Sequence, residues 1–327
     1  MKNEAIQALE ERLHRSLRRL IPTGRGVLLA VSGGADSMTL LSGGARLAGR
    51  VGLTFEAATV DHHLRAESRS ECELVARLAR ALGIPHHVLD AKVTGLSGVE
   101  ASARKARYEA LERLRVTRKL GYVATAHTAS DQAETLLMRL ARGTSLAGAA
   151  GIHEARADRV VRPLLFASRA DVEAYVAARG IEVARDAMNT DQTFLRVRIR
   201  DQVLPALALA AGPGAERALA RFATLAAEDD AWLGAEAERA STKVQWAEDG
   251  TLEVEALLAL GPPIARRVLA RWLSGHGVPL DGALLEDILK AARDRSTATL
   301  PGDRVVACSN GRVTLQGAPP RLHATSS

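Results

Sequence analysis

The chain has 327 residues, of which 47% are hydrophobic and 25% are charged, the balance of a globular protein with a sizeable core. This composition excludes a disordered chain, and no apolar run approaches the ~18 residues of a membrane-spanning helix. The formal net charge of +6 favours a polyanionic partner, nucleic acid above all. Only 3% of residues are aromatic, which argues against an RNA-binding module that works mainly by base stacking.

The cysteine count and the first segment narrow the protein class further. Cys72 and Cys308 are the only cysteines, which excludes a disulfide framework, a cysteine-based zinc site and CxxC chemistry. Residues 1–20 have apolar side chains at helical spacing, which predicts an amphipathic helix. This segment lacks the apolar core of a secretory signal, and its three glutamates argue against a transit peptide. We therefore expect a cytoplasmic protein.

Strand and helix patterns alternate over roughly the first 200 residues. Strands are expected at 27–31, 53–60, 87–89, 122–126 and 160–161, with helices from 37 and at 67–82, 99–120, 130–142 and 171–178. Such alternation indicates βαβ units and therefore an α/β fold with a doubly wound parallel sheet. Ligands of such sheets bind at the carboxyl ends of the strands, where the strand order reverses.

The alternating pattern stops at Ala211-Gly212-Pro213-Gly214. Helices are expected after it at 215–239, 253–260, 264–273 and 283–293, followed by a hairpin around Asn310-Gly311. We expect a catalytic domain at 1–211, a smaller and mostly helical domain at 214–316, and a loose tail at 317–327.

The segment Ser32-Gly33-Gly34-Ala35-Asp36-Ser37 lies between the first strand and its helix. Its two glycines permit positive φ and close backbone approach, while the helix N-terminus and two serine hydroxyls offer donors. The segment therefore predicts a nest for a pyrophosphate-sized anion, in which Asp36 holds a bridging Mg²⁺. It is neither a Walker A loop nor a GxGxxG fingerprint. A nearby Ser42-Gly43-Gly44-Ala45 lacks the Asp-Ser pair and is interpreted as the frayed end of the helix.

Two further motifs follow the second and third strands. Val60-Asp61-His62-His63-Leu64-Arg65 comes at a carboxyl end, and its adjacent histidines, without a clear third ligand, are a weak metal signal. Arg104 and Arg107 are three residues apart and share a helix face. Such a pair is either a solvated surface or a site for phosphate or carboxylate.

Acidic and basic residues follow the fourth and fifth strands. Asp131 and Glu134 come just after Ala126-His127, on one face of a first helical turn. They could be partners of the helix dipole, but their place at a strand end favours a site for a cation or an ammonium group. Arg196, Arg198 and Arg200 would line one side of an extended segment, as a phosphate track or as a salt-bridged surface.

In chain order the motifs are SGGADS, VDHHLR, ARKARY, AHTASDQAET, RPLL, DAMNTD and RVRIR. As a set they resemble the tRNA(Ile)-lysidine synthetases, members of the PP-loop ATP pyrophosphatases, over about residues 26–205. The chain departs from the family's pattern at four positions. The family usually has glycine at His63, often a second histidine at Thr128, and usually an acid at Ser130 and asparagine at Val197.

The resemblance implies an ATP-dependent ligase. It would adenylate the oxygen on carbon 2 of the wobble cytidine in tRNA(Ile) with a CAU anticodon. L-lysine would then displace AMP to form lysidine. The implied nucleotide contacts are Ser32, Gly33, Gly34, Ala35, Asp36, Ser37, Asp61 and His62, with Asp36 also holding Mg²⁺.

The same resemblance implies roles for the other candidate residues. The catalytic set would be Asp36, Arg107, Asp131 and Glu134, in which Arg107 orients the base and the last two receive and deprotonate the lysine ammonium. Arg196, Arg198 and Arg200 would hold the tRNA backbone. The second domain would grip the tRNA stem, and a homodimer is compatible with the sequence.

Three alternatives remain open at this point. Another PP-loop enzyme that modifies tRNA or forms an amide is one, although the two cysteines suit sulfur transfer poorly and the chain has no room for a glutaminase domain. A non-catalytic ATP-binding module would release no pyrophosphate in response to tRNA. A non-enzymatic RNA-binding protein would not need the Asp36-Ser37 half of the loop.

Overall fold

The computed structural model describes residues 2–61, 67–90, 99–184, 195–244, 250–279, 282–302 and 304–317. The chain forms two compact units, one of Met1–Thr144 with Gly148–Leu225 and the other of Ser145–Ala147 with Ala226–Ser327. They divide within helix α10 (Ala215–Val244), beyond the boundary expected at Gly214. Within the described ranges, no helix is long and apolar enough to cross a membrane.

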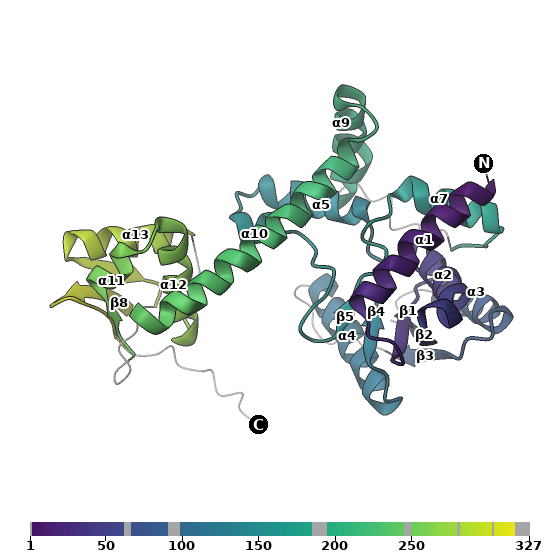
Figure 1. The fold of residues 1–327 in the computed structure, drawn as a ribbon, viewed down its shortest axis with the longest axis horizontal. Coiled ribbons are helices and arrows are strands. Elements are labelled where there is room, and N and C mark those ends of the chain that lie inside the picture. Colours follow the sequence, from purple (N-terminus) through teal and green to yellow (C-terminus); the bar gives the residue numbers. More distant parts are fainter. Residues whose placement is uncertain are drawn as a thin grey trace. The chain divides into compact units, whose positions relative to one another are not determined.

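A five-stranded parallel sheet organises the first unit (Figure 1). Its strands are β1 (Gly26–Ala30), β2 (Thr54–Asp61), β3 (His86–Asp90), β4 (Tyr122–Ala124) and β5 (Val160–Val161). They are ordered β3-β2-β1-β4-β5, and neighbouring strands pair in parallel. The doubly wound prediction is therefore confirmed. The order reverses between β1 and β4, which makes their carboxyl ends the expected ligand site.

Helices cover both faces of this sheet. The apolar side chains of α1 (Lys2–Leu20), α2 (Ala35–Val51), α3 (Glu67–Ala81) and α7 (Arg169–Arg179) form one core on the sheet, and those of α4 (Val99–Thr117) form another. Neighbouring residues of β1 enter different cores, since Leu29 belongs to the first and Leu28 to the second. Burial on both faces explains why β1 is continuously apolar.

The second Ser-Gly-Gly-Ala segment lies in the middle of α2, so its interpretation as a frayed helix end is wrong. A Cβ atom on Gly43 would lie 2.6 Å from Leu13 Cδ2 of α1. The Ser42 hydroxyl is 3.2 Å from the Tyr175 hydroxyl of α7. Small residues here let α1 and α7 pack closely on α2, and this packing offsets the ~1 kcal/mol that a glycine costs inside a helix.

The chain after β4 and β5 is helical. Its elements are α5 (Ala129–Leu140), α6 (Leu146–Ala149), α8 (Leu195–Arg198), the π-helical turn η2 (Ile199–Val203) and α9 (Leu204–Ala211). The extended segment considered for the three arginines is therefore wrong. Ile199 is buried with Ala133 of α5, and coiling of the segment brings it there. Val197 and Ile199 are buried while Arg196 and Arg198 are exposed, so the burial alternates although the backbone is helical.

The second unit has its own core of helices on an antiparallel sheet. Its helices are α11 (Val254–Ala259), α12 (Pro262–Gly275) and α13 (Gly282–Asp294), together with the later part of α10. The sheet order is β6 (Leu252–Glu253), β9 (Arg312–Gln316), β8 (Arg304–Ser309) and β7 (Thr297–Leu300). Asn310 and Gly311 have φ of 51° and 74°, which confirms the predicted hairpin turn. Cys72 and Cys308 are free and buried.

Candidate active site

The loop after β1 is shaped by one left-handed glycine. Gly33 has φ of 89°, whereas Gly34 is the N-cap of α2 with φ of −71°, so only Gly33 uses the positive φ expected of both. The Ser37 hydroxyl accepts the Ser32 N–H at 3.1 Å and donates to the Gly34 carbonyl at 2.9 Å. The Ala184 N–H donates to the Gly33 carbonyl at 2.9 Å. No side chain caps the N-terminus of α2, whose first N–H groups are therefore available to an anion.

Asp36 lies in the first turn of α2, where negative charges gather. Burial, together with the nearby carboxylates of Asp131 and Glu134, raises the pKa of Asp36 to about 7 although Arg169 opposes the shift. A carboxyl whose negative surroundings are only partly compensated, beside a phosphate nest, fits Mg²⁺, which takes few protein ligands when phosphates and water supply the rest. In the part of the chain that the structure describes, no group of three or more metal-ligating side chains occurs.

Asp131 and Glu134 already bind a cationic side chain. Arg196 donates from Nη2 to Asp131 Oδ1 and from Nε to Glu134 Oε2, both at 2.6 Å. The other oxygen of Asp131 accepts the N–H of Thr128 at 2.8 Å and its hydroxyl at 3.0 Å. The Thr128 hydroxyl in turn accepts the backbone N–H of Asp131 at 3.4 Å, which makes Thr128 the N-cap of α5. Glu134 is buried, and this burial raises its pKa although Arg196 opposes the shift.

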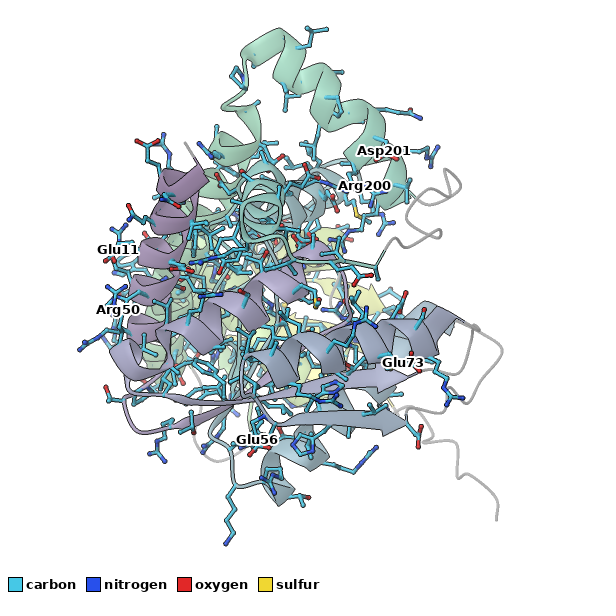
Figure 2. The ribbon with its side chains drawn as sticks, turned by 90° about the vertical axis from the view of Figure 1, so that its right-hand side faces the viewer. Glu11, Arg50, Glu56, Glu73, Arg200 and Asp201 are labelled. Carbon is cyan, nitrogen blue, oxygen red and sulfur yellow. The ribbon has the colours of Figure 1, made fainter. Side chains whose placement is uncertain are left out.

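Among the three arginines of the RVRIR segment, Arg196 hydrogen-bonds both carboxylates, and the charge of Arg200 also lowers the pKa of Glu134. Arg200 lies beside Asp201, with its Nε 2.9 Å from Oδ1 (Figure 2). Arg198 is exposed on α8. The helical backbone therefore separates side chains that an extended strand would have aligned.

Ser130 connects this site to α10. Its hydroxyl donates to Glu216 Oε1 at 2.6 Å and accepts the Arg169 N–H at 2.9 Å. The neighbouring Arg217 pairs with Asp171 at 3.0 Å. A carboxylate from the first turn of α10 thus contacts Ser130, the residue before Asp131, although it is 86 residues from Ser130 in sequence. No local motif signals Glu216, and sequence reasoning missed it.

A second group of basic side chains surrounds an aromatic ring. The guanidinium groups of Arg104 and Arg156 lie 5.3 and 5.2 Å from the centre of the Tyr108 ring. Burial lowers the pKa of Arg107 and of Arg162, which comes directly after β5. Arg162 is buried, whereas Arg104 and Arg156 are exposed, so these two present positive charge of the kind that receives phosphate.

His127 adjoins this basic group just beyond β4. Its Nδ1 is 2.9 Å from the Thr125 hydroxyl. Burial lowers the pKa of His127 to about 4, and the nearby Arg162, Arg104 and Arg107 lower it while Asp131 raises it. His127 is therefore neutral at pH 7. The sequence motif contained this residue, but the predicted catalytic set omitted it.

Some predicted residues lie outside the described part of the chain. Asp61 ends β2, but its side chain, His62 and the segment from Asp186 to Asp191 are not described.

Comparisons with known proteins cover both units. A family model for a PP-loop domain matches residues 6–207, and a model for a TilS substrate binding domain matches residues 252–314. A tRNA(Ile)-lysidine synthase of Salinispora tropica is 39% identical, over 94% of this chain and 96% of the relative. The protein of that name from Rhodopseudomonas palustris is 39% identical over 98% and 97%.

A solved structure has a similar fold over most of this chain. The U34-tRNA thiolase NcsA from Methanococcus maripaludis matches with a TM-score of 0.60 and 15% identity, over 70% of this chain and 81% of the thiolase. At this identity the likeness concerns the fold alone.

Proposed function

The chain belongs to the tRNA(Ile)-lysidine synthase family, ligases that use ATP to modify tRNA, and from this premise we propose how its residues share the reaction. The oxygen on carbon 2 of the wobble cytidine is a poor leaving group. Adenylation turns it into AMP, which the ε-amine of lysine can displace. The reaction therefore has an adenylation step and a lysine-transfer step, and each step needs different chemistry from the site.

In the adenylation step, the loop after β1 holds the part of ATP that leaves as pyrophosphate. The first N–H groups of α2 and the hydroxyl of Ser32 donate to phosphate oxygens, and Gly33 keeps the backbone close to them. Negative charge grows on pyrophosphate as it departs, and fixed donors stabilise it. Asp36 would hold Mg²⁺, which supplies further charge neutralisation when bound.

In the transfer step, Asp131 and Glu134 receive the lysine ammonium. The observation that carries this assignment is the Arg196 guanidinium held at 2.6 Å by both carboxylates, since a pair that binds one cationic side chain suits another. Lysine needs the same oxygens, so Arg196 leaves them when lysine binds. Burial raises the pKa of Glu134, which makes its carboxylate a better acceptor for the proton that the ammonium must lose.

The basic group around Tyr108 orients the cytidine. Arg107 and Arg104 contact the base or its phosphate after the nucleotide leaves the stack of the anticodon loop. The second unit, which matches a substrate-binding domain, grips the tRNA stem by shape and charge. A tRNA substrate also supports the expectation of a cytoplasmic enzyme. A homodimer is compatible with this proposed function.

The test is ATP-dependent incorporation of labelled lysine into a transcript of tRNA(Ile) with a CAU anticodon. Methionine tRNA, which has the same anticodon, is the control. We expect label in the first only, with one pyrophosphate released per lysine. Pyrophosphate release without lysine incorporation would keep the adenylation step and remove lysine as the nucleophile. The absence of both lysine incorporation and pyrophosphate release would contradict the proposal.

A further inference from the structure

A cavity of about 410 Å³ lies at the edge of the parallel sheet opposite the ATP loop. It is formed where β1 and β4 begin and where α4 ends, and Gly26, Gly121 and four cationic residues line it. Strand β1 has five residues and so spans roughly 17 Å between the two edges. A ligand in this cavity would therefore not share the donors of the ATP loop.

The cavity concentrates positive charge. Arg25, Arg115, Lys119 and Arg159 line it, from three separate segments of the chain. Arg115 is neutralised, because it donates to both oxygens of Glu112, at 2.7 and 2.6 Å. Among the described residues, neither Arg25, Lys119 nor Arg159 has an acidic partner within ion-pair distance. The cavity is therefore lined by three cationic residues without an ion pair and by Arg115, which is paired with Glu112.

The neighbouring acids are engaged elsewhere. Glu56 is bound by Arg118, with 3.0 Å between Nε and Oε2, and Asp158 by Arg156 at 2.6 Å. Glu112 lies outside the lining, and its pKa is lowered first by its hydrogen bond from Arg115 and also by the charge of Arg159. One carboxylate thus acts on two of the four cationic residues, and the protein compensates the positive charge of the cavity only in part.

Two of the cationic residues hold a backbone conformation that costs energy. Lys119 has φ of 55° and Arg159 has φ of 63°, in the left-handed region where glycine is preferred. Among the described residues only Arg295 and Asn310 share this feature outside glycine. The chain keeps long cationic side chains at two turns where glycine would relieve the strain, as is common where strain serves a ligand site.

Two glycines let the lining residues pack closely. A Cβ atom on Gly26 would lie 2.5 Å from Leu120 Cδ2, and one on Gly121 would lie 3.3 Å from Arg25 Cβ. Glycine at these positions therefore makes room for the side chains of Leu120 and Arg25 beside the cavity. From the volume, the incompletely compensated cations and the strained backbone at two of them, we propose that the cavity binds phosphoryl groups, either of an RNA backbone or of a free polyphosphate.

The test compares the wild-type chain with the triple variant R25Q, K119Q and R159Q. Glutamine keeps most of the side-chain length and removes the charge. A matched control, R50Q with R69Q and R80Q, removes three charges from α2 and α3. If the triple variant does not fold, R25E alone reverses one cavity charge at a residue with ordinary φ.

Two probes distinguish the sources of phosphate. Calorimetry with inorganic pyrophosphate is expected to give two sites for the wild-type chain and the control, and one for the cavity variant. Binding of the tRNA(Ile) transcript is measured against salt concentration. If RNA backbone is the ligand, the cavity variant binds about tenfold more weakly at 0.1 M salt, with a salt slope smaller by about two to three.

Each result decides the proposal. Loss of the pyrophosphate site with unchanged tRNA affinity supports the cavity and identifies a free polyphosphate. Weaker tRNA binding by the cavity variant alone supports the cavity and identifies RNA. Unchanged binding of both probes would overturn the proposal, and so would equal losses in the control, because net charge would then explain them.

Discussion

Replacing Asp36 by asparagine should stabilise the metal-free protein while it abolishes adenylation. The native pKa of Asp36 is raised to about 7 from an ordinary value of 3.8. The folded state therefore holds this proton more tightly than the unfolded state, and folding stability falls as pH rises from about 4 to 7. Asparagine resembles the protonated carboxyl in shape and charge and does not titrate, so the variant escapes this loss.

The magnitude follows from the two pKa values. One pKa unit corresponds to 1.36 kcal/mol, so ionisation of Asp36 lowers the free energy of unfolding by about 2 kcal/mol at pH 5.5 and by about 4 kcal/mol at pH 8, where the loss is nearly complete. Water that enters the site would reduce both figures, so we expect D36N to gain about 2–4 kcal/mol at pH 8. For a unit of this size that gain raises Tm by roughly 5–15 °C.

The assay is denaturant unfolding at pH 5.5 and pH 8 in the presence of a chelator. The exposed Asp229 provides the control D229N, which should change stability little at either pH. The decisive quantity is the growth of the D36N gain with pH, because a packing effect would be the same at both values. Equal stability of D36N and wild type at both pH values would refute the reasoning, and so would a variant that is less stable at pH 8.

Three further predictions concern other residues. E134Q should keep tRNA-dependent pyrophosphate release but raise the KM for lysine at least tenfold, and parallel loss of both steps would contradict the division of roles. G43A should destabilise the first unit by about 1–3 kcal/mol, because its Cβ would lie 2.6 Å from Leu13 Cδ2. G49A on the same helix meets no atom within 4 Å, so it should stabilise slightly, and equal effects would refute the packing argument. The pKa of His127 is lowered to about 4, so its imidazole NMR signals should not titrate above pH 5. Folding stability should fall as pH drops from 6.5 towards 4, because the unfolded state then binds a proton that the folded state does not. An NMR titration midpoint near 6.5 would contradict the burial of this side chain.

Local patterns in the sequence were sufficient to predict the parallel sheet and the edge at which it binds ligands. The apolar run of β1 reflects burial on both faces, and a Gly-rich turn between strand and helix requires Gly33 whatever the rest of the chain does. Asp131 and Glu134 were predicted to share a helix face at this edge, and they do, bound together by Arg196.

Features that depend on tertiary packing were missed. Glu216 reaches Ser130 only because α10 begins against α5 and α7, a contact that no sequence spacing encodes. The alternation around Val197 was compatible with a strand, but the burial of Ile199 against α5 gives the same alternation on a helical backbone. Periodicity over so few residues does not distinguish these two cases.

The two Gly-Gly pairs of the chain differ in what a second mutation can repair. Gly33 is fixed by its own φ of 89°, a property of a single residue, so no change elsewhere makes a larger side chain acceptable there. Gly43 is fixed by the distance to Leu13, a property of a pair. A smaller residue at position 13 should therefore suppress the defect of G43A. Genetic suppression thus separates a glycine required by its backbone from one required by its neighbour.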